Sequence, residues 1–217
     1  MAIDSASGHW VHRHLLVLRF ALFNIVASGL LIAVFMQGWL DGAMLGYTVW
    51  LTSGICAVFV FGLLLCGLQI WRANSELNTL DTDEPPSQSQ VGRYLAKVVG
   101  RSAESRTISA SVLRNRLGNQ IVIVRQTADS LVFLGLVGTV IGFIVALSGV
   151  DPQASAQLDE VATMVATLVA GMSIALYTTL VGAVLHVWLM VNHRLLATGT
   201  SNLFNAIVEM GEQRVGV

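Results

Sequence analysis

The chain has 217 residues, of which 54% are hydrophobic and only 12% charged, with a net charge of −1 and a mean hydropathy of +0.70. An ordinary soluble domain carries about 25% charged residues, so this composition excludes a water-soluble globular protein and indicates a membrane protein with several spans. The near-zero net charge also excludes a nucleic-acid-binding protein that depends on a broadly basic surface.

Four apolar stretches are long enough to cross a bilayer as helices, which takes about 20 residues. They lie at 15–36, 48–70, 130–150 and 162–191, and the last is long enough to tilt or to project beyond the lipid. The first stretch is too long for a signal peptide and no small-x-small cleavage site follows it, so we interpret it as a retained helix. The predicted fold class is therefore an all-α polytopic membrane protein with four transmembrane helices.

The positions of Lys and Arg predict the orientation of these helices. All 12 basic residues lie near the start of the first span, between the second and third spans, or after the fourth span. The loops at 37–47 and 151–161 contain acidic residues and no basic residue. Because short cytoplasmic loops retain Lys and Arg, we expect both the N- and C-termini to lie in the cytoplasm.

Long cytoplasmic helical extensions are also expected. A Pro- and Ser-bearing acidic sequence, LDTDEPPSQSQ, follows the second span, and apolar residues then recur at helical spacing from 91 to 129. No proline separates this segment from the third span, so one long helix is predicted to run through both. The expected organisation is a cytoplasmic N-terminus (1–14), spans one and two (15–70), a cytoplasmic linker and helix (71–129), spans three and four (130–191) and a cytoplasmic tail (192–217).

The usual signatures of catalysis are absent from the sequence. We find no Gly-rich phosphate loop, no nucleophile elbow and no His, Cys and Glu cluster at metal-ligand spacing. The protein is therefore not expected to be an enzyme or to hold a cofactor or metal. Two isolated polar residues lie inside spans: Asn24 is a candidate for an interhelical hydrogen bond, and a lone His186 is more often interfacial or structural than a ligand.

Spans three and four carry the most informative pattern. Small residues of the third span recur at steps of three or four, so they share one face that allows another helix to approach closely. Threonines and small residues of the fourth span fall within one wedge of that helix, opposite larger apolar side chains. The residues are Gly135, Gly138, Thr139, Gly142, Ala146 and Gly149 in the third span and Thr163, Thr167, Gly171, Ala175, Thr178, Thr179, Gly182 and His186 in the fourth.

Two interpretations of this pattern remain open. Gly and Thr are common where membrane helices pack, and a threonine can donate its hydroxyl to its own helix, so helix packing alone accounts for the pattern. Alternatively, a hydroxyl-lined face without a central charge suits a partner helix that brings its own charge, with the hydroxyl oxygens serving a passing cation.

Two segments resemble the MotA/TolQ/ExbB family of ion-channel subunits. The sequence GLVGTVIGFIVAL (135–147) resembles the G-L-x-G-T-V-x-G pattern of that family's first pore-lining helix. The sequence IALYTTLVGAVLHVW (174–188) resembles the A-L-x-T-T-L-x-G-A pattern of its second. Four spans with a cytoplasmic insert between the second and third are similar to MotA, whereas TolQ and ExbB have three.

The resemblance implies a homopentamer in a bacterial inner membrane, around two copies of a single-span MotB/ExbD/TolR-like protein whose transmembrane Asp carries H⁺ or Na⁺. Ion flow would turn one ring relative to the other, and spans one and two would form an outer layer against membrane lipid. The implied ion-pathway residues are Thr139, Thr178 and Thr179; the glycines expected to pack around the partner are Gly135, Gly138, Gly142, Gly171 and Gly182; and the secondary pathway candidates are Thr163, Thr167, Ser173 and His186.

The sequence departs from the family pattern at two positions. Ile174 stands where TolQ and ExbB typically have an acidic residue, so any charge on the pathway must come from the partner. Trp188 falls close to the position of a frequent proline, and the insert and tail are short beside those of MotA, which makes a flagellar role weaker than the channel assignment. The alternative function is a non-conducting tetraspan scaffold, in which the same residues only pack helices.

Overall fold

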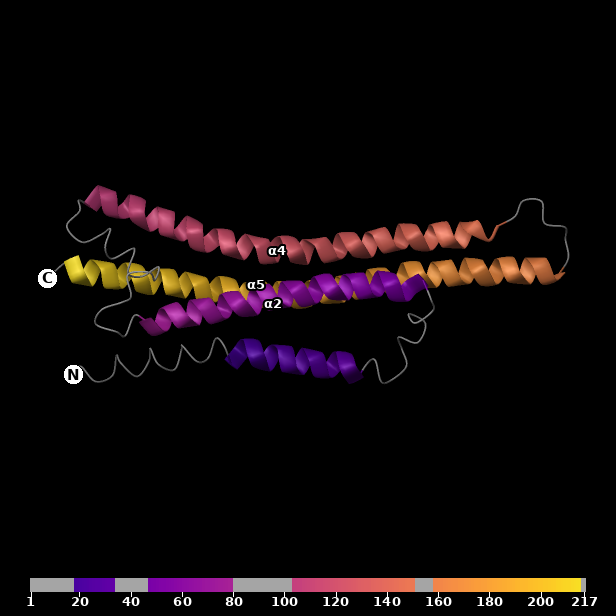
Figure 1. Cartoon of the computed structure of the whole chain (residues 1–217), viewed down its shortest axis with the longest axis horizontal. Coiled ribbons are helices and arrows are strands. Elements are labelled where there is room, and N and C mark those ends of the chain that lie inside the picture. The colour runs from indigo at the N-terminus through magenta and orange to yellow at the C-terminus, as the bar shows by residue number, and fades with distance from the viewer. Residues whose placement is uncertain (1–17, 34–46, 80–102, 151–157, 216–217) are drawn as a thin grey trace. The chain divides into compact units, whose positions relative to one another are not determined.

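The computed structural model describes residues 18–33, 47–79, 103–150 and 158–215, and these residues are almost entirely helical. The helices are Leu18–Ala33, α2 (Tyr47–Thr79), α4 (Ala103–Ser148) and α5 (Leu158–Val215), and no strand occurs in the described ranges (Figure 1). The predicted all-α fold class is therefore confirmed.

Three of the helices are long and apolar enough to cross a membrane. The candidate spans are Val49–Ala73, Thr107–Ser148 and Val161–Gly211, which contain the predicted second, third and fourth spans almost completely. The helix Leu18–Ala33 is apolar but shorter than a bilayer requires, and the ends of the predicted first span lie outside the described residues. The chain is thus a multi-pass membrane protein, while its first span and the cytoplasmic location of its termini stay predictions.

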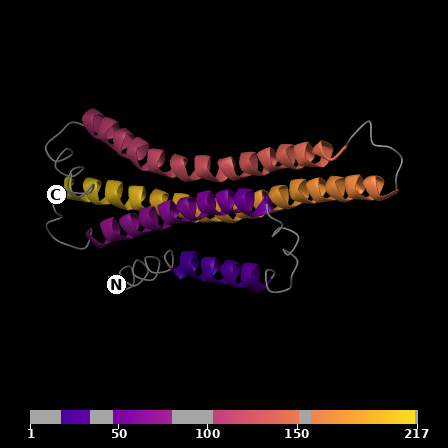
Figure 2. The same cartoon turned by 45° about the vertical axis from the view of Figure 1, so that its right-hand side comes forward.

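The predicted continuity of the third span with the helix before it is confirmed within the described residues. α4 has 46 residues, so it is about 69 Å long, and α5 with 58 residues is about 87 Å long. A hydrocarbon core is about 30 Å thick. Both helices must therefore extend well beyond the lipid. Figure 2 shows each of them as one continuous ribbon. Residues 91–102 of the predicted helix lie outside the described residues.

The chain divides into two compact units, and its basic residues all lie in one of them. The first, which we call the basic unit, comprises Met1–Ile25, Leu63–Arg125 and Val191–Val217, and it contains all 12 Lys and Arg residues. The second, the apolar unit, comprises Val26–Gly62 and Gln126–Met190 and contains none of them. This division agrees with a membrane-embedded apolar unit.

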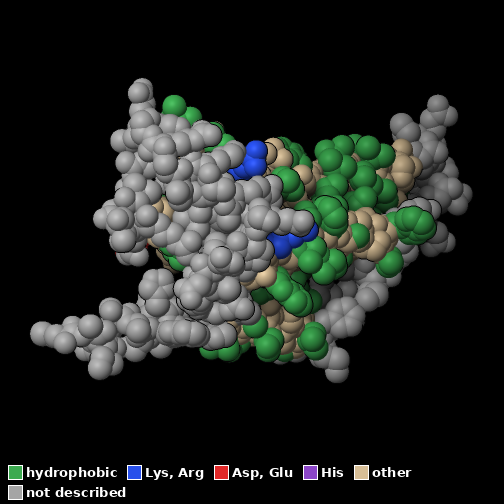
Figure 3. Space-filling model, turned by 60° about the vertical axis from the view of Figure 1, so that its left-hand side comes forward, with side chains coloured by type: hydrophobic (Ala, Val, Ile, Leu, Met, Phe, Trp, Pro, Cys, Tyr) green, Lys and Arg blue, Asp and Glu red, His purple; other side chains and the backbone are tan. Residues whose placement is uncertain are grey.

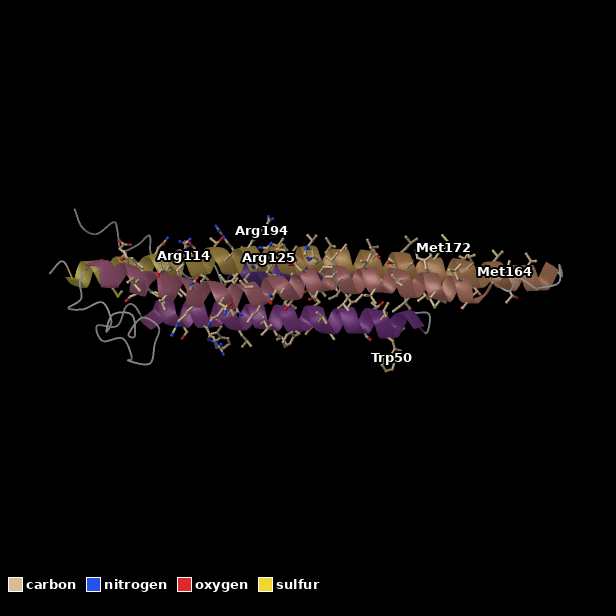
Figure 4. The ribbon with its side chains drawn as sticks, turned by 90° about the horizontal axis from the view of Figure 1, so that it is seen from above. Trp50, Arg114, Arg125, Met164, Met172 and Arg194 are labelled. Carbon is tan, nitrogen blue, oxygen red and sulfur yellow. The ribbon has the colours of Figure 1, made fainter. Side chains whose placement is uncertain are left out.

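The basic unit has a small core of its own. Leu113 and Leu117 of α4 pack with Leu203 and Ile207 of α5, and Ala73 of α2 lies against them. Each pair is four residues apart on its helix, so both members face the same side. The charged side chains of Arg114, Arg125 and Arg194 project from α4 and α5 away from such contacts (Figure 4).

A reciprocal amide pair joins the first helix to α5 within the basic unit. Nδ2 of Asn24 donates to Oδ1 of Asn192 at 2.8 Å, and Nδ2 of Asn192 donates back to Oδ1 of Asn24 at 3.3 Å. Asn192 is completely buried. The interhelical hydrogen bond expected of Asn24 is confirmed, and its partner fixes the first helix against α5.

The apolar unit presents a hydrophobic surface to its surroundings. Trp50 is 85% exposed and Leu176 is 71% exposed, and Figure 4 shows Trp50 and Met172 projecting outward from α2 and α5. On the face drawn in Figure 3, hydrophobic side chains cover most of the described surface. Such a surface is costly in water, at about 25 cal/mol for each Å² of apolar area, so lipid or other protein helices must cover it.

The amide pair generates a test of stability. Asn24→Leu removes the partner of a fully buried amide and should lower the free energy of unfolding by about 1 to 3 kcal/mol. The double variant Asn24→Leu/Asn192→Leu leaves no amide unpaired and should recover most of that loss. Unfolding midpoints in mixed detergent micelles measure both. Equal midpoints for the single and double variants would contradict the pairing.

Candidate functional site at the contact of α4 and α5

The two helices of the apolar unit approach each other so closely that their backbones touch. A Cβ atom added to Gly142 would lie 2.6 Å from the backbone nitrogen of Ala175 and 2.7 Å from the carbonyl oxygen of Gly171. A Cβ atom on Gly182 would lie 2.8 Å from the carbonyl oxygen of Leu131. Backbone atoms cannot move aside as a side-chain end can, so only glycine fits at these positions.

These contacts repeat along α4 with a period of seven residues. Gly149 faces Thr167, Gly142 faces Ala175, Gly135 faces Thr179, and Ala128 accepts a bond from His186. A seven-residue repeat keeps these residues of α4 on one face of the helix. We call this line of contacts the α4–α5 seam.

Side chains of α2 cover another side of the same helices. The Leu51 side chain lies 3.0 Å from the position of a Cβ on Gly138. Phe59 meets Trp188 edge to face with 5.1 Å between ring centroids. In the sequence Trp188 falls close to the position of a frequent proline of the resembling family. No local signal identifies Phe59 as its partner.

The three threonines predicted to line an ion pathway differ in their exposure. Thr178 is completely buried against Gly138, and its hydroxyl lies 2.9 Å from the carbonyl oxygen of Ile174 on its own helix. Thr179 is exposed, and its hydroxyl lies 3.2 Å from the carbonyl oxygen of Ala175 and 3.4 Å from that of Gly135 across the seam. Adjacent residues point about 100° apart on a helix, which accounts for the difference.

Thr139 is partly exposed, and its hydroxyl donates to the carbonyl oxygen of Leu136 at 2.6 Å. Gly138 of α4 contacts Thr178 of α5. The next residue on each helix is a threonine that reaches the surface, Thr139 on α4 and Thr179 on α5. The seam therefore brings all three predicted pathway threonines into one region.

The secondary candidates Thr167 and Ser173 bond within α5. The Thr167 hydroxyl donates to the Thr163 carbonyl oxygen at 3.1 Å, and the Ser173 hydroxyl donates to that of Val169 at 2.9 Å. A hydroxyl that donates in this way keeps oxygen lone pairs for a hydrogen bond or a cation. The hydroxyls can therefore both satisfy their own helix and serve a passing ion.

His186 makes a polar contact across the seam. Its Nδ1 atom lies 2.8 Å from the carbonyl oxygen of Ala128 on α4. A carbonyl only accepts, so Nδ1 must carry the proton that is donated. The sequence indicated that His186 is structural or interfacial, and the family resemblance made it a secondary pathway candidate, but neither identified the carbonyl that orients the ring.

The five glycines predicted to surround a partner helix lie at the seam within one chain. Gly135, Gly138 and Gly142 of α4 face residues of α5, and Gly171 and Gly182 of α5 face α4. Their close contacts thus hold α4 against α5. Packing of the same glycines against a partner protein stays a prediction.

The surface beside the exposed threonines is apolar and carries no acid or base in mid-span. Leu136, Val140 and Leu180 are between 55% and 59% exposed. Among the described side chains of the apolar unit, the titratable groups are Cys56, Asp129, Tyr177 and His186. An ion at the level of Thr139 and Thr179 must therefore find its counter-charge outside this part of the chain.

Comparison with known proteins assigns this region to a family. A family model described as the MotA/TolQ/ExbB proton channel family matches residues 97–209, which include the whole seam. No curated protein and no solved structure matches the chain.

The seam generates a test with a matched control. Gly142→Ala places a methyl group against the backbone of α5 and should destabilise the protein by about 1 to 3 kcal/mol. Gly54→Ala, in α2 of the same unit, meets nothing within 4 Å and should leave stability unchanged or raise it by a few tenths of a kcal/mol. Unfolding midpoints in detergent check the pair, and equal effects of the two substitutions would contradict the close contact.

Proposed function

The chain belongs to the MotA/TolQ/ExbB proton channel family, and from this premise we propose that it is the ring-forming subunit of an ion-driven motor in a bacterial inner membrane. The observation that carries the proposal is the seam itself. It joins α4 and α5 into one wall that bears hydroxyl groups and no charge in mid-span, and it lies inside the matched residues. Thr139 and Thr179 are two of the hydroxyls that reach the surface of this wall.

The partner in this proposal supplies the charge. Residues 130–150 and 161–190 contain no Asp, Glu, Lys or Arg, so the ion-carrying carboxylate comes from a single-span MotB/ExbD/TolR-like protein. Five copies of the chain surround two such partner helices, and membrane lipid covers the outward surface. The large exposed apolar area of α4 and α5 supports this assembly, because it needs neighbouring helices or lipid to cover it.

The physical basis of the motion is the cost of a charge in an apolar site. A carboxylate that is ionised beside the exposed apolar side chains is strongly disfavoured, so it moves past them only when an ion neutralises it. The hydroxyl oxygens of Thr139 and Thr179 would accept a hydrogen bond from the protonated carboxyl group. One charge that falls through 100 mV releases about 2.3 kcal/mol, which is sufficient to drive a step over a barrier of similar size.

The ion in the proposal is a proton, and sodium is the alternative because paired hydroxyls also replace part of the hydration of a cation. Thr178 lies behind the surface, so it would meet the ion only where α4 and α5 separate. The glycines of the seam would keep the wall rigid as the partner moves.

A non-conducting tetraspan scaffold is the second candidate. It is favoured by the observation that Thr139, Thr167, Ser173 and Thr178 already direct their hydroxyls to carbonyl groups of their own helices. In that function the hydroxyls would contribute only to helix packing.

Two threonine substitutions, one of them a control, distinguish the channel from the scaffold. Thr179→Val keeps the side-chain shape and removes the hydroxyl, and it should reduce ion flux at least about tenfold while assembly with the co-purified partner stays intact. Thr198→Val is the control, because Thr198 is an exposed threonine of the basic unit whose hydroxyl bonds the Arg194 carbonyl at 3.0 Å. Flux is measured in proteoliposomes. Absence of ion flux through the unsubstituted complex, together with failed assembly of Thr179→Val, would support the scaffold.

A further inference from the structure

Two side chains of α5 reach across the seam to backbone carbonyls of α4. Thr179 contacts the carbonyl oxygen of Gly135 at 3.4 Å, and His186 contacts that of Ala128 at 2.8 Å. The two contacts are seven residues apart on both helices. Seven residues return a helix to within about 20° of the same direction, so His186 continues the line of Thr179 along one face of α5.

The hydrogen bond to Ala128 determines which nitrogen of His186 is available for acid–base chemistry. In the neutral ring Nδ1 carries the proton that it donates to the carbonyl, so Nε2 has a lone pair that can accept another proton. The ring is therefore held as a proton acceptor without losing its contact across the seam. A protonated ring would keep the same bond, because both nitrogens then donate.

The position of His186 along α5 lies near the end of the uncharged stretch. Arg194 is eight residues further on, which is about 12 Å along the helix, and His193 precedes it. On α4, Asp129 adjoins Ala128, and Arg125 lies one turn before it. Among the described side chains of the apolar unit, the other titratable groups are the thiol of Cys56 on α2 and the phenol of Tyr177 on α5.

We propose that His186 is the proton-transfer residue at the cytoplasmic end of the ion pathway. This inference rests on the proposed function. A proton released at the level of Thr179 binds Nε2 of the neutral ring and converts it to imidazolium. The same Nε2–H then passes its proton to water on the cytoplasmic side, and the ring returns to its original neutral form.

The distance sets one condition on the transfer. Seven residues correspond to about 10 Å along α5, which is longer than one hydrogen bond. Bridging water or the carboxyl group of a moving partner helix must therefore carry the proton between the level of Thr179 and His186. Sodium cannot use this route, since the acceptor is a nitrogen that must bind and release a proton.

The test separates proton transfer from a purely structural bond. His186→Asn retains an N–H donor for the Ala128 carbonyl but has no nitrogen that can accept and release a proton. Studied with its co-purified partner in proteoliposomes, it should assemble as the unsubstituted protein does and unfold at the same midpoint. Its proton flux should fall about 100-fold.

A second variant provides rescue. His186→Gly leaves space for a free base, and added imidazole should restore a measurable part of the proton flux. Normal flux in His186→Asn would overturn the proposal, and so would a loss of flux that imidazole does not rescue and that accompanies failed assembly. A wild-type complex that conducts sodium and not protons would also overturn it. In each of these cases, a loss of ion flux in Thr179→Val would still support the proposed channel function. Normal flux in both Thr179→Val and His186→Asn would contradict the channel function as well.

Discussion

The contact between α4 and α5 is the constraint on which the rest of the structure depends. Gly142, Gly171 and Gly182 meet backbone atoms of the facing helix at distances that exclude a Cβ. In lipid there is little hydrophobic force to join two apolar helices, so close van der Waals packing must supply the attraction. The seven-residue repeat maintains this packing along the seam and determines which side chains can reach across it.

The same constraint determines which polar side chains of this helix pair, uncharged in mid-span, reach its surface. Because Thr178 is used in the contact, its neighbour Thr179 points about 100° away and reaches the surface. The seam thus divides the polar residues of α5 into a buried group that packs and an exposed group that can meet a partner. His186 belongs to the line of Thr179, with its ring oriented by the Ala128 carbonyl.

The sequence predicted what depends on local pattern. The hydropathy of the last three spans and the absence of proline before the third were sufficient to predict their helices and the unbroken course of α4. The pattern also showed that Gly138 and Gly142 allow a close approach, but periodicity does not say which helix approaches. The partner of Asn24 is 168 residues away, and the contact of Phe59 with Trp188 joins α2 to α5, so neither pair could be identified without the tertiary structure.

We propose that the chain forms a ring around a charged partner. The seam offers hydroxyls but no counter-charge for an ion, so the partner must supply it. Native mass spectrometry of the complex, gently extracted from its host membrane, tests this most directly. The account predicts five copies of the chain with two copies of a single-span protein that has an Asp in its span. A monomer, or a homo-oligomer without such a companion, would contradict it and leave the threonines as packing residues.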